Sequence, residues 1–134
     1  MMRLYRMARW LYLHHVPLLP AFFKGVIRVV FAATVPYTAE IGAGTRFPHG
    51  GQGVVLHEET VIGRDCIIQA NAVLGGRGGL PGAPALGDGV LVGAGAACLG
   101  AISIGDGAKI GANAVVLNDV PAGATAVGVP ARIL

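Results

Sequence analysis

The histidine at position 49 interrupts a regular pattern, within the stretch RFPHGGQGVVLHEET (residues 46–60). On both sides of this stretch an apolar residue returns every six positions, but from Phe47 to Leu56 the spacing is nine. Three extra residues around His49 must therefore bulge outward, where a side chain can reach a cleft. Because imidazole titrates near neutrality, His49 is a candidate general base that takes a proton from a hydroxyl group. The alternative is a surface histidine that caps a turn.

Two further polar residues, His57 and Glu58, follow at the next corner of the pattern. We interpret them as groups that contact an acceptor or orient His49. The alternative is a solvated pair on the surface.

Other kinds of chemistry have little support in the sequence. Cys66 and Cys98 lack metal-ligand spacing, and we expect them to be small buried apolar residues in a reducing cytoplasm. Only two histidines lie in the repeated region, too few for a three-histidine zinc site, so we predict no metal. No basic patch with interleaved aromatic residues indicates nucleic-acid binding.

The six-residue period of the apolar residues fits neither a strand, which has period two, nor a helix, which has period 3.6. It fits short strands joined by tight corners, three to a coil, with coils stacked at roughly 4.8 Å. About five coils fit, which predicts a three-sided prism roughly 25 Å long. The apolar residues that recur with this spacing, here called the ladder residues, are Val35, Ile41 and Phe47; then Leu56, Ile62, Ile68 and Leu74; then Leu86, Val92, Cys98, Ile104, Ile110 and Val116.

A second interruption lies between Leu74 and Leu86, where GGRGGLPGAP (residues 75–84) is rich in turn formers. We expect an extruded loop there. In a stacked solenoid such insertions mark the working surface.

These features resemble the hexapeptide-repeat acyltransferases. The resemblance implies an all-β solenoid, a left-handed parallel β-helix over residues 35–134, preceded by an α-helical arm over residues 1–34. Within that family the chain is most similar to serine acetyltransferases and to their short relatives from polysaccharide gene clusters. The matching segments are IGAGTRFPHGGQGVVLHEETVIG, AVLGGRGG, LGDGVLVGAGAACLGAISIGDGAKIGANAVVLNDVP and GVPARIL.

The resemblance implies an acetyl-CoA-dependent O-acetyltransferase with His49 as its general base. It places acetyl-CoA in a groove between two neighbouring prisms of a homotrimer. Small residues let the pantetheine arm approach the backbone, at positions that match Gly76, Ala94 and Ala112. Cations hold the phosphates, at Lys109 and Arg132, with Thr125 and Arg77 as weaker additions.

The chain departs from the serine acetyltransferase pattern at groups around the acceptor. Thr34 stands where that family has the aspartate that steadies its histidine, and Pro48 replaces another aspartate. The loop 75–84 keeps Arg77 but has no histidine. The predicted acceptor is therefore a sugar or another small hydroxyl compound. Serine is the alternative acceptor, and a non-catalytic scaffold is a further alternative.

The first 36 residues carry five basic residues and no acidic one, whereas residues 37–134 carry a net charge of −2. The spacing predicts a helix over residues 3–15 and a second over 21–33, separated by VPLLP (residues 16–20). Leu4, Met7, Ala8, Leu11 and His15 should share one face of the first helix. The arm either caps the open end of the prism or contacts an anionic membrane. We expect a cytoplasmic protein, peripheral on the inner membrane face in the second case.

Overall fold

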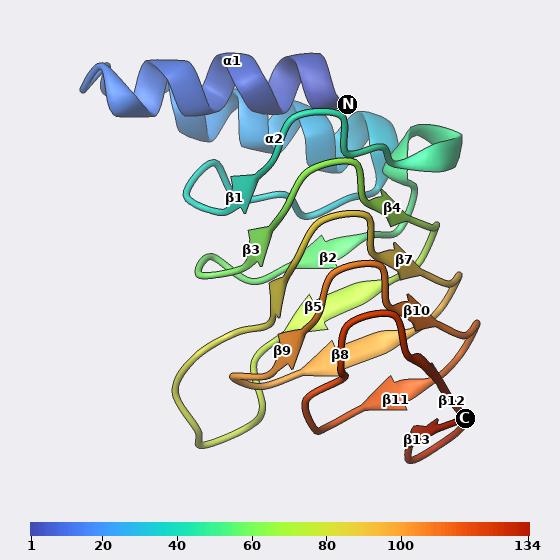
Figure 1. Cartoon of the computed structure of the whole chain (residues 1–134). Coiled ribbons are helices and arrows are strands. Elements are labelled where there is room, and N and C mark those ends of the chain that lie inside the picture. Colours follow the sequence, from blue (N-terminus) through green and yellow to red (C-terminus); the bar gives the residue numbers. More distant parts are fainter.

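The computed structural model describes all 134 residues, as two helices followed by a stack of short strands (Figure 1). The helices are α1 (Met2–Leu13) and α2 (Leu19–Phe31), and one 3₁₀ turn, η1, spans Pro48–Gly51. The strands are β1 (Glu40–Ile41), β2 (Val55–Leu56), β3 (Val61–Ile62), β4 (Ile67–Ile68), β5 (Val73–Gly75), β6 (Ala85–Leu86), β7 (Leu91–Val92), β8 (Ala97–Leu99), β9 (Ser103–Ile104), β10 (Lys109–Ile110), β11 (Val115–Val116), β12 (Thr125–Val127) and β13 (Arg132–Ile133).

Successive strands visit three sheets in turn, so the chain winds as a three-sided coil. The first sheet has the order β1-β3-β6-β9, the second β4-β7-β10-β12-β13 and the third β2-β5-β8-β11. Neighbouring strands are parallel, except that β13 folds back antiparallel on β12. Each strand is only two or three residues long. The chain turns a corner once one side chain has pointed into the prism and its neighbour has pointed outward.

The register between coils accounts for both interruptions of the sequence pattern. Val55 pairs with Val73, which sets the regular coil at eighteen residues. Glu40 pairs with Val61, twenty-one residues on, so the coil that contains His49 holds three extra residues. Val73 pairs with Ala97, twenty-four residues on, so the loop 75–84 adds six. Both insertions leave the strand pairing intact, because they are confined to corners.

The ladder residues predicted from the sequence form the interior of the prism. On the third sheet Leu56, Leu74, Cys98 and Val116 stack in register, each buried. Equivalent stacks on the other two sheets complete one continuous apolar core. The prediction that Cys66 and Cys98 are buried is confirmed.

Glycine recurs after the ladder residue because adjacent coils approach closely at that corner. A Cβ atom on Gly63 would lie 2.4 Å from the carbonyl oxygen of Gly87 in the next coil. No side chain fits in that space, so the corner requires glycine.

The two helices lie across the end of the prism where the first coil begins (Figure 1). Tyr5 donates its hydroxyl hydrogen bond to the backbone carbonyl of Ala39. The Nη1 atom of Arg9 donates to the carbonyl oxygens of Tyr37, Thr38 and Ala39, at 3.1, 3.2 and 3.2 Å. These bonds attach α1 to the turn that enters β1.

The side of α1 that packs on the prism coincides only in part with the shared face identified from the sequence. Ala8 of that face is buried, whereas Met7 and His15 are exposed, and Tyr5 from outside the face is buried. The reason is that Tyr5 and Arg9 satisfy backbone carbonyls of the first coil, which rotates the helix toward their side. The second helix begins at Leu19, two residues earlier than predicted, because Pro20 is accommodated in its first turn.

Arg9 should contribute measurably to the docking of α1. We expect Arg9→Ala to lower the free energy of unfolding by about 1–3 kcal/mol, because three carbonyl acceptors lose a charged donor. Urea denaturation measures this. Arg6→Ala, on the exposed side of the same helix, is the matched control and should change the midpoint little. Equal effects of the two substitutions would contradict the anchoring role.

Both thiols should be unreactive in the folded protein. Burial raises the pKa of the Cys66 thiol, and burial raises the pKa of the Cys98 thiol to about 12. Iodoacetamide should therefore label neither residue until urea unfolds the chain. Because the folded-state thiol pKa values are raised, burying the two neutral thiols stabilises the fold fully below about pH 8.5. This stabilisation declines as the pH rises further and the thiols of the unfolded chain ionise. Stoichiometric labelling of the folded protein would contradict this.

Candidate active site

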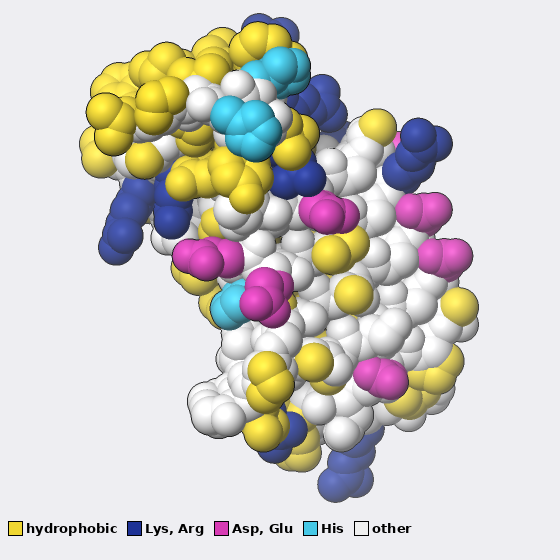
Figure 2. All heavy atoms as spheres, turned by 90° about the vertical axis from the view of Figure 1, so that its left-hand side faces the viewer, with side chains coloured by type: hydrophobic (Ala, Val, Ile, Leu, Met, Phe, Trp, Pro, Cys, Tyr) yellow, Lys and Arg dark blue, Asp and Glu magenta, His cyan; other side chains and the backbone are white.

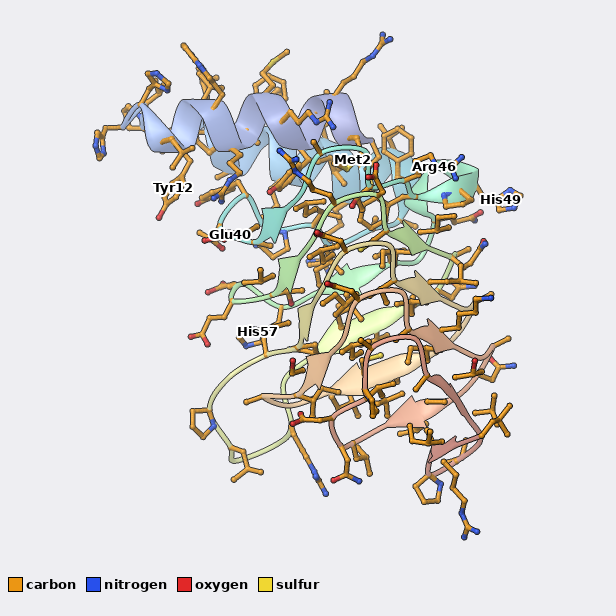
Figure 3. The ribbon with its side chains drawn as sticks, in the orientation of Figure 1. Met2, Tyr12, Glu40, Arg46, His49 and His57 are labelled. Atoms are coloured by element: carbon orange, nitrogen blue, oxygen red, sulfur yellow. The ribbon has the colours of Figure 1, made fainter.

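His49 lies on a corner of the prism, in the turn η1 between the second and third sheets. Its backbone has φ 58° and ψ 32°, in the left-handed region, and Gly50 follows with φ 69°. This conformation is uncommon for a residue with a side chain and pushes the imidazole outward. The ring is exposed and points away from the prism (Figure 3).

The arm packs directly on the glycines that follow His49. A Cβ atom on Gly50 would lie 2.9 Å from Cδ1 of Phe31, the last residue of α2. A Cβ atom on Gly51 would lie 2.6 Å from Sδ of Met1. The start of α1 and the end of α2 therefore hold the His49 turn between them.

A pocket of about 260 Å³ opens beside the imidazole. All six lining residues come from the end of α2, from the turn or from the residues next to them, and none carries a carboxylate. They are Val29, Val30, Phe31, Ala32, His49 and Gln52. Sequence reasoning missed this wall, although the doublet Gly50-Gly51 was a signal that another element packs closely there.

Thr34 lies one coil above the strand that follows His49. Its backbone N–H donates to Val54 and its carbonyl accepts from Leu56, at 2.8 and 2.9 Å. Its hydroxyl makes no hydrogen bond to His49.

The prism edge between the second and third sheets, here called the His49 edge, consists of the corners at residues 47–54, 69–72, 93–96 and 111–114. Ala94 and Ala112 lie on this edge below His49, stacked through a 2.9 Å backbone bond from Asn113 to Ala94. Small side chains leave the backbone accessible along the edge. The structure thus brings together His49 and two of the three predicted pantetheine positions.

The predicted phosphate-binding residues lie beside the lower part of this edge. Lys109 and Thr125 are register partners on the second sheet, with their side chains on its outer face. Arg132 is exposed on β13, the next strand of the same sheet. Two cations and a hydroxyl are therefore grouped near the C-terminal end of the prism.

The remaining predicted residues lie on a different edge, here called the His57 edge, made of the corners at residues 57–60, 76–84 and 100–102. The Nδ1 atom of His57 accepts a 3.0 Å hydrogen bond from the Glu59 amide. A Cβ atom on Gly76 would lie 3.5 Å from Cδ2 of His57, so the loop carrying Arg77 begins against this ring. Glu58 is exposed on the same corner.

Figure 3 shows His49 and His57 on opposite sides of the prism. His57 therefore does not orient His49 within one chain, contrary to that part of the interpretation. For the same reason Gly76 and Arg77 do not share an edge with Ala94 in one chain. The predicted site residues form two groups, one on each edge.

The fold defined here is a three-sided parallel β-helix with a two-helix cap, and its repeats match a known family. Residues 85–118 match the family described as the hexapeptide repeat of succinyl-transferase. The chain is 39% identical over 132 residues to the serine acetyltransferase of Synechococcus elongatus, covering 97% of this chain and 54% of that protein.

Solved structures of serine acetyltransferases superpose closely on the chain. A soybean serine acetyltransferase complexed with serine gives a TM-score of 0.93 at 44% identity, covering 99% of this chain and 55% of the other. A Brucella abortus serine acetyltransferase in complex with coenzyme A gives a TM-score of 0.94 at 34% identity, covering 99% and 54%. Nearly the whole chain is thus similar to serine acetyltransferases, and it spans about half the length of the relatives it matches.

The close packing on Gly50 should be visible in stability. Gly50→Ala should lower the free energy of unfolding more than Gly107→Ala, because both have φ near 70° but only Gly50 faces Phe31. The left-handed backbone alone should cost about 1–2 kcal/mol in each variant. Urea denaturation measures the difference, and adding Phe31→Ala to both variants should remove it. Equal losses in the two single variants would show that Phe31 does not constrain the turn.

Proposed function

We propose that the chain is an acetyl-CoA-dependent O-acetyltransferase of the serine acetyltransferase type, with His49 as the general base. The observation that carries the proposal is the His49 edge, where an exposed imidazole lies above the small residues Ala94 and Ala112. The relatives support it, since one neighbour by its description holds coenzyme A and another holds serine. In keeping with the family resemblance, we take the coil to be left-handed.

In the proposed reaction a ring nitrogen of His49 accepts the proton of the acceptor hydroxyl as its oxygen attacks the thioester carbonyl. The carbon–oxygen bond forms and the carbon–sulfur bond breaks. The proton then passes from the imidazolium to the departing thiolate, which leaves as free coenzyme A. His49 is restored, so no covalent enzyme intermediate is required.

The donor would lie along the His49 edge with its phosphates toward the C-terminal end of the prism. Lys109 and Arg132 supply positive charge there, and Thr125 supplies a hydroxyl. A guanidinium can hold a phosphate through two parallel hydrogen bonds, which a lysine cannot.

The site would be completed by a neighbouring copy in a homotrimer. One chain carries His49 on one edge and His57 on another, and Gly76, which precedes Arg77, lies against His57. Three prisms packed side by side bring unlike edges together around a threefold axis. Each groove would then receive the base from one copy and the loop 75–84 from the next.

The comparisons favour serine as the acceptor, rather than the sugar hydroxyl predicted from the sequence. The curated relatives that the chain matches over nearly all its length at about 40% identity are named serine acetyltransferases. Serine is therefore the first acceptor to test.

A sugar or other neutral hydroxyl compound is the second candidate, because of the pocket beside His49. Its walls include no carboxylate that could pair with the serine ammonium group. Thr34 and Pro48 stand where the resemblance implies aspartates. A neutral acceptor requires neither charge.

The test is release of free thiol from acetyl-CoA with L-serine and with a panel of sugars and nucleotide sugars. Wild type should turn over acetyl-CoA with at least one acceptor. His49→Ala should lower kcat by about 10²–10⁴-fold, because the base is lost. His15→Ala is a matched control, since His15 is also exposed and has the same φ of 58°. Full turnover in folded His49→Ala would overturn the mechanism.

The rival scaffold is tested in the same preparation. Calorimetric titration with coenzyme A should show binding to wild type and to His49→Ala, with weaker binding to Arg132→Ala. No binding to wild type would favour a non-catalytic scaffold.

We place the enzyme in the cytoplasm, where the two unpaired thiols would stay reduced.

A further inference from the structure

Exposed apolar side chains are concentrated on the helical arm. Nine of the fifteen large apolar side chains that are exposed lie between residues 7 and 30, although this segment is under a fifth of the chain. Figure 2 shows hydrophobic side chains crowded over the helix layer, whereas the prism below presents a mostly uncharged surface with scattered charged and hydrophobic side chains. The set is Met7, Trp10, Tyr12, Leu13, Leu18, Leu19, Phe22, Val29 and Val30.

The outer face of α2 forms an apolar groove of about 440 Å³. Phe22 and Val29 are 62% and 86% exposed along it, so the groove is open and lacks a partner within the chain. Val29 and Val30 also line the pocket beside His49. The apolar face is therefore continuous with the proposed acceptor pocket.

The positive charge of the arm indicates which kind of partner this apolar face would bind. Residues 1–36 carry five basic residues and no acidic one. Arg9 is committed to backbone carbonyls, but Arg3, Arg6 and Arg28 are exposed. Apolar and aromatic side chains combined with unpaired cations are the features of helices that lie on anionic lipid. Neither helix has the length and apolarity needed to cross a bilayer.

We propose that the helical arm docks on an anionic membrane surface, with the apolar face of α2 in the lipid interface. Phe22 and Val29 would enter the boundary between headgroups and acyl chains, and the exposed arginines would lie among the phosphates. The mouth of the His49 pocket would then open at the membrane surface, where acceptors linked to lipid are accessible. The docking itself requires no acetyl transfer and can be tested separately.

The test is flotation of the full chain with lipid vesicles. Vesicles of phosphatidylcholine mixed with phosphatidylglycerol should bind the protein at least about tenfold more strongly than phosphatidylcholine alone, because each exposed cation adds attraction. High salt should reduce this difference. Arg28→Gln should weaken binding to the anionic vesicles.

The apolar contribution is tested with Phe22→Ser combined with Val29→Ser, which should lower vesicle binding by about tenfold or more. Leu134→Ser is the matched control, because Leu134 is 83% exposed but lies at the opposite end of the prism, and it should bind as wild type does. Circular dichroism confirms that the variants fold. Absence of wild-type binding to anionic vesicles overturns the proposal. In that case light scattering measures the number of chains per assembly. If the double variant has fewer or more chains than wild type, the apolar face of α2 contacts a second copy of the chain and not lipid.

Discussion

The parallel pairing between successive coils is the constraint on which the rest of the structure depends. Each strand contributes only two or three residues, so a coil is stable only when its ladder residues meet those of the next coil in register. Extra residues can be accommodated at corners, where they do not disturb the pairing. Both insertions obey this rule, and both carry residues assigned to chemistry: His49 on one edge and Arg77 on another.

The helical arm converts the first insertion from a loose bulge into a defined turn. Phe31 packs on Gly50 and Met1 on Gly51, so two helices fix the backbone on which His49 stands. The same helices are attached to the first coil through Tyr5 and Arg9. Stability of the cap and position of the imidazole are therefore coupled. The end of α2 also walls the pocket beside the histidine, which links the acceptor site to the exposed face of the arm.

The sequence was enough to predict the ladder residues, because a six-residue period leaves few alternatives for where side chains point. The breaks in that period also located the corner position of His49 and the loop 75–84. The buried side of α1 was not predictable, since it depends on carbonyls of the first coil that accept from Tyr5 and Arg9. Nor was the pocket wall, because α2 reaches His49 only through tertiary packing. The resemblance supplied the residues of the donor site, but not their division between two edges.

The most direct test of a site shared between copies is co-expression of His49→Ala with Arg77→Ala. At low acetyl-CoA concentration each variant alone should be less active than wild type in acetyl transfer, because every groove lacks either the general base or one phosphate-binding cation. With random mixing of equal amounts, about a quarter of all grooves would combine an intact His49 with an intact Arg77, so about a quarter of wild-type activity should return. Mixed assemblies that form but stay as inactive as the separate variants would contradict the account.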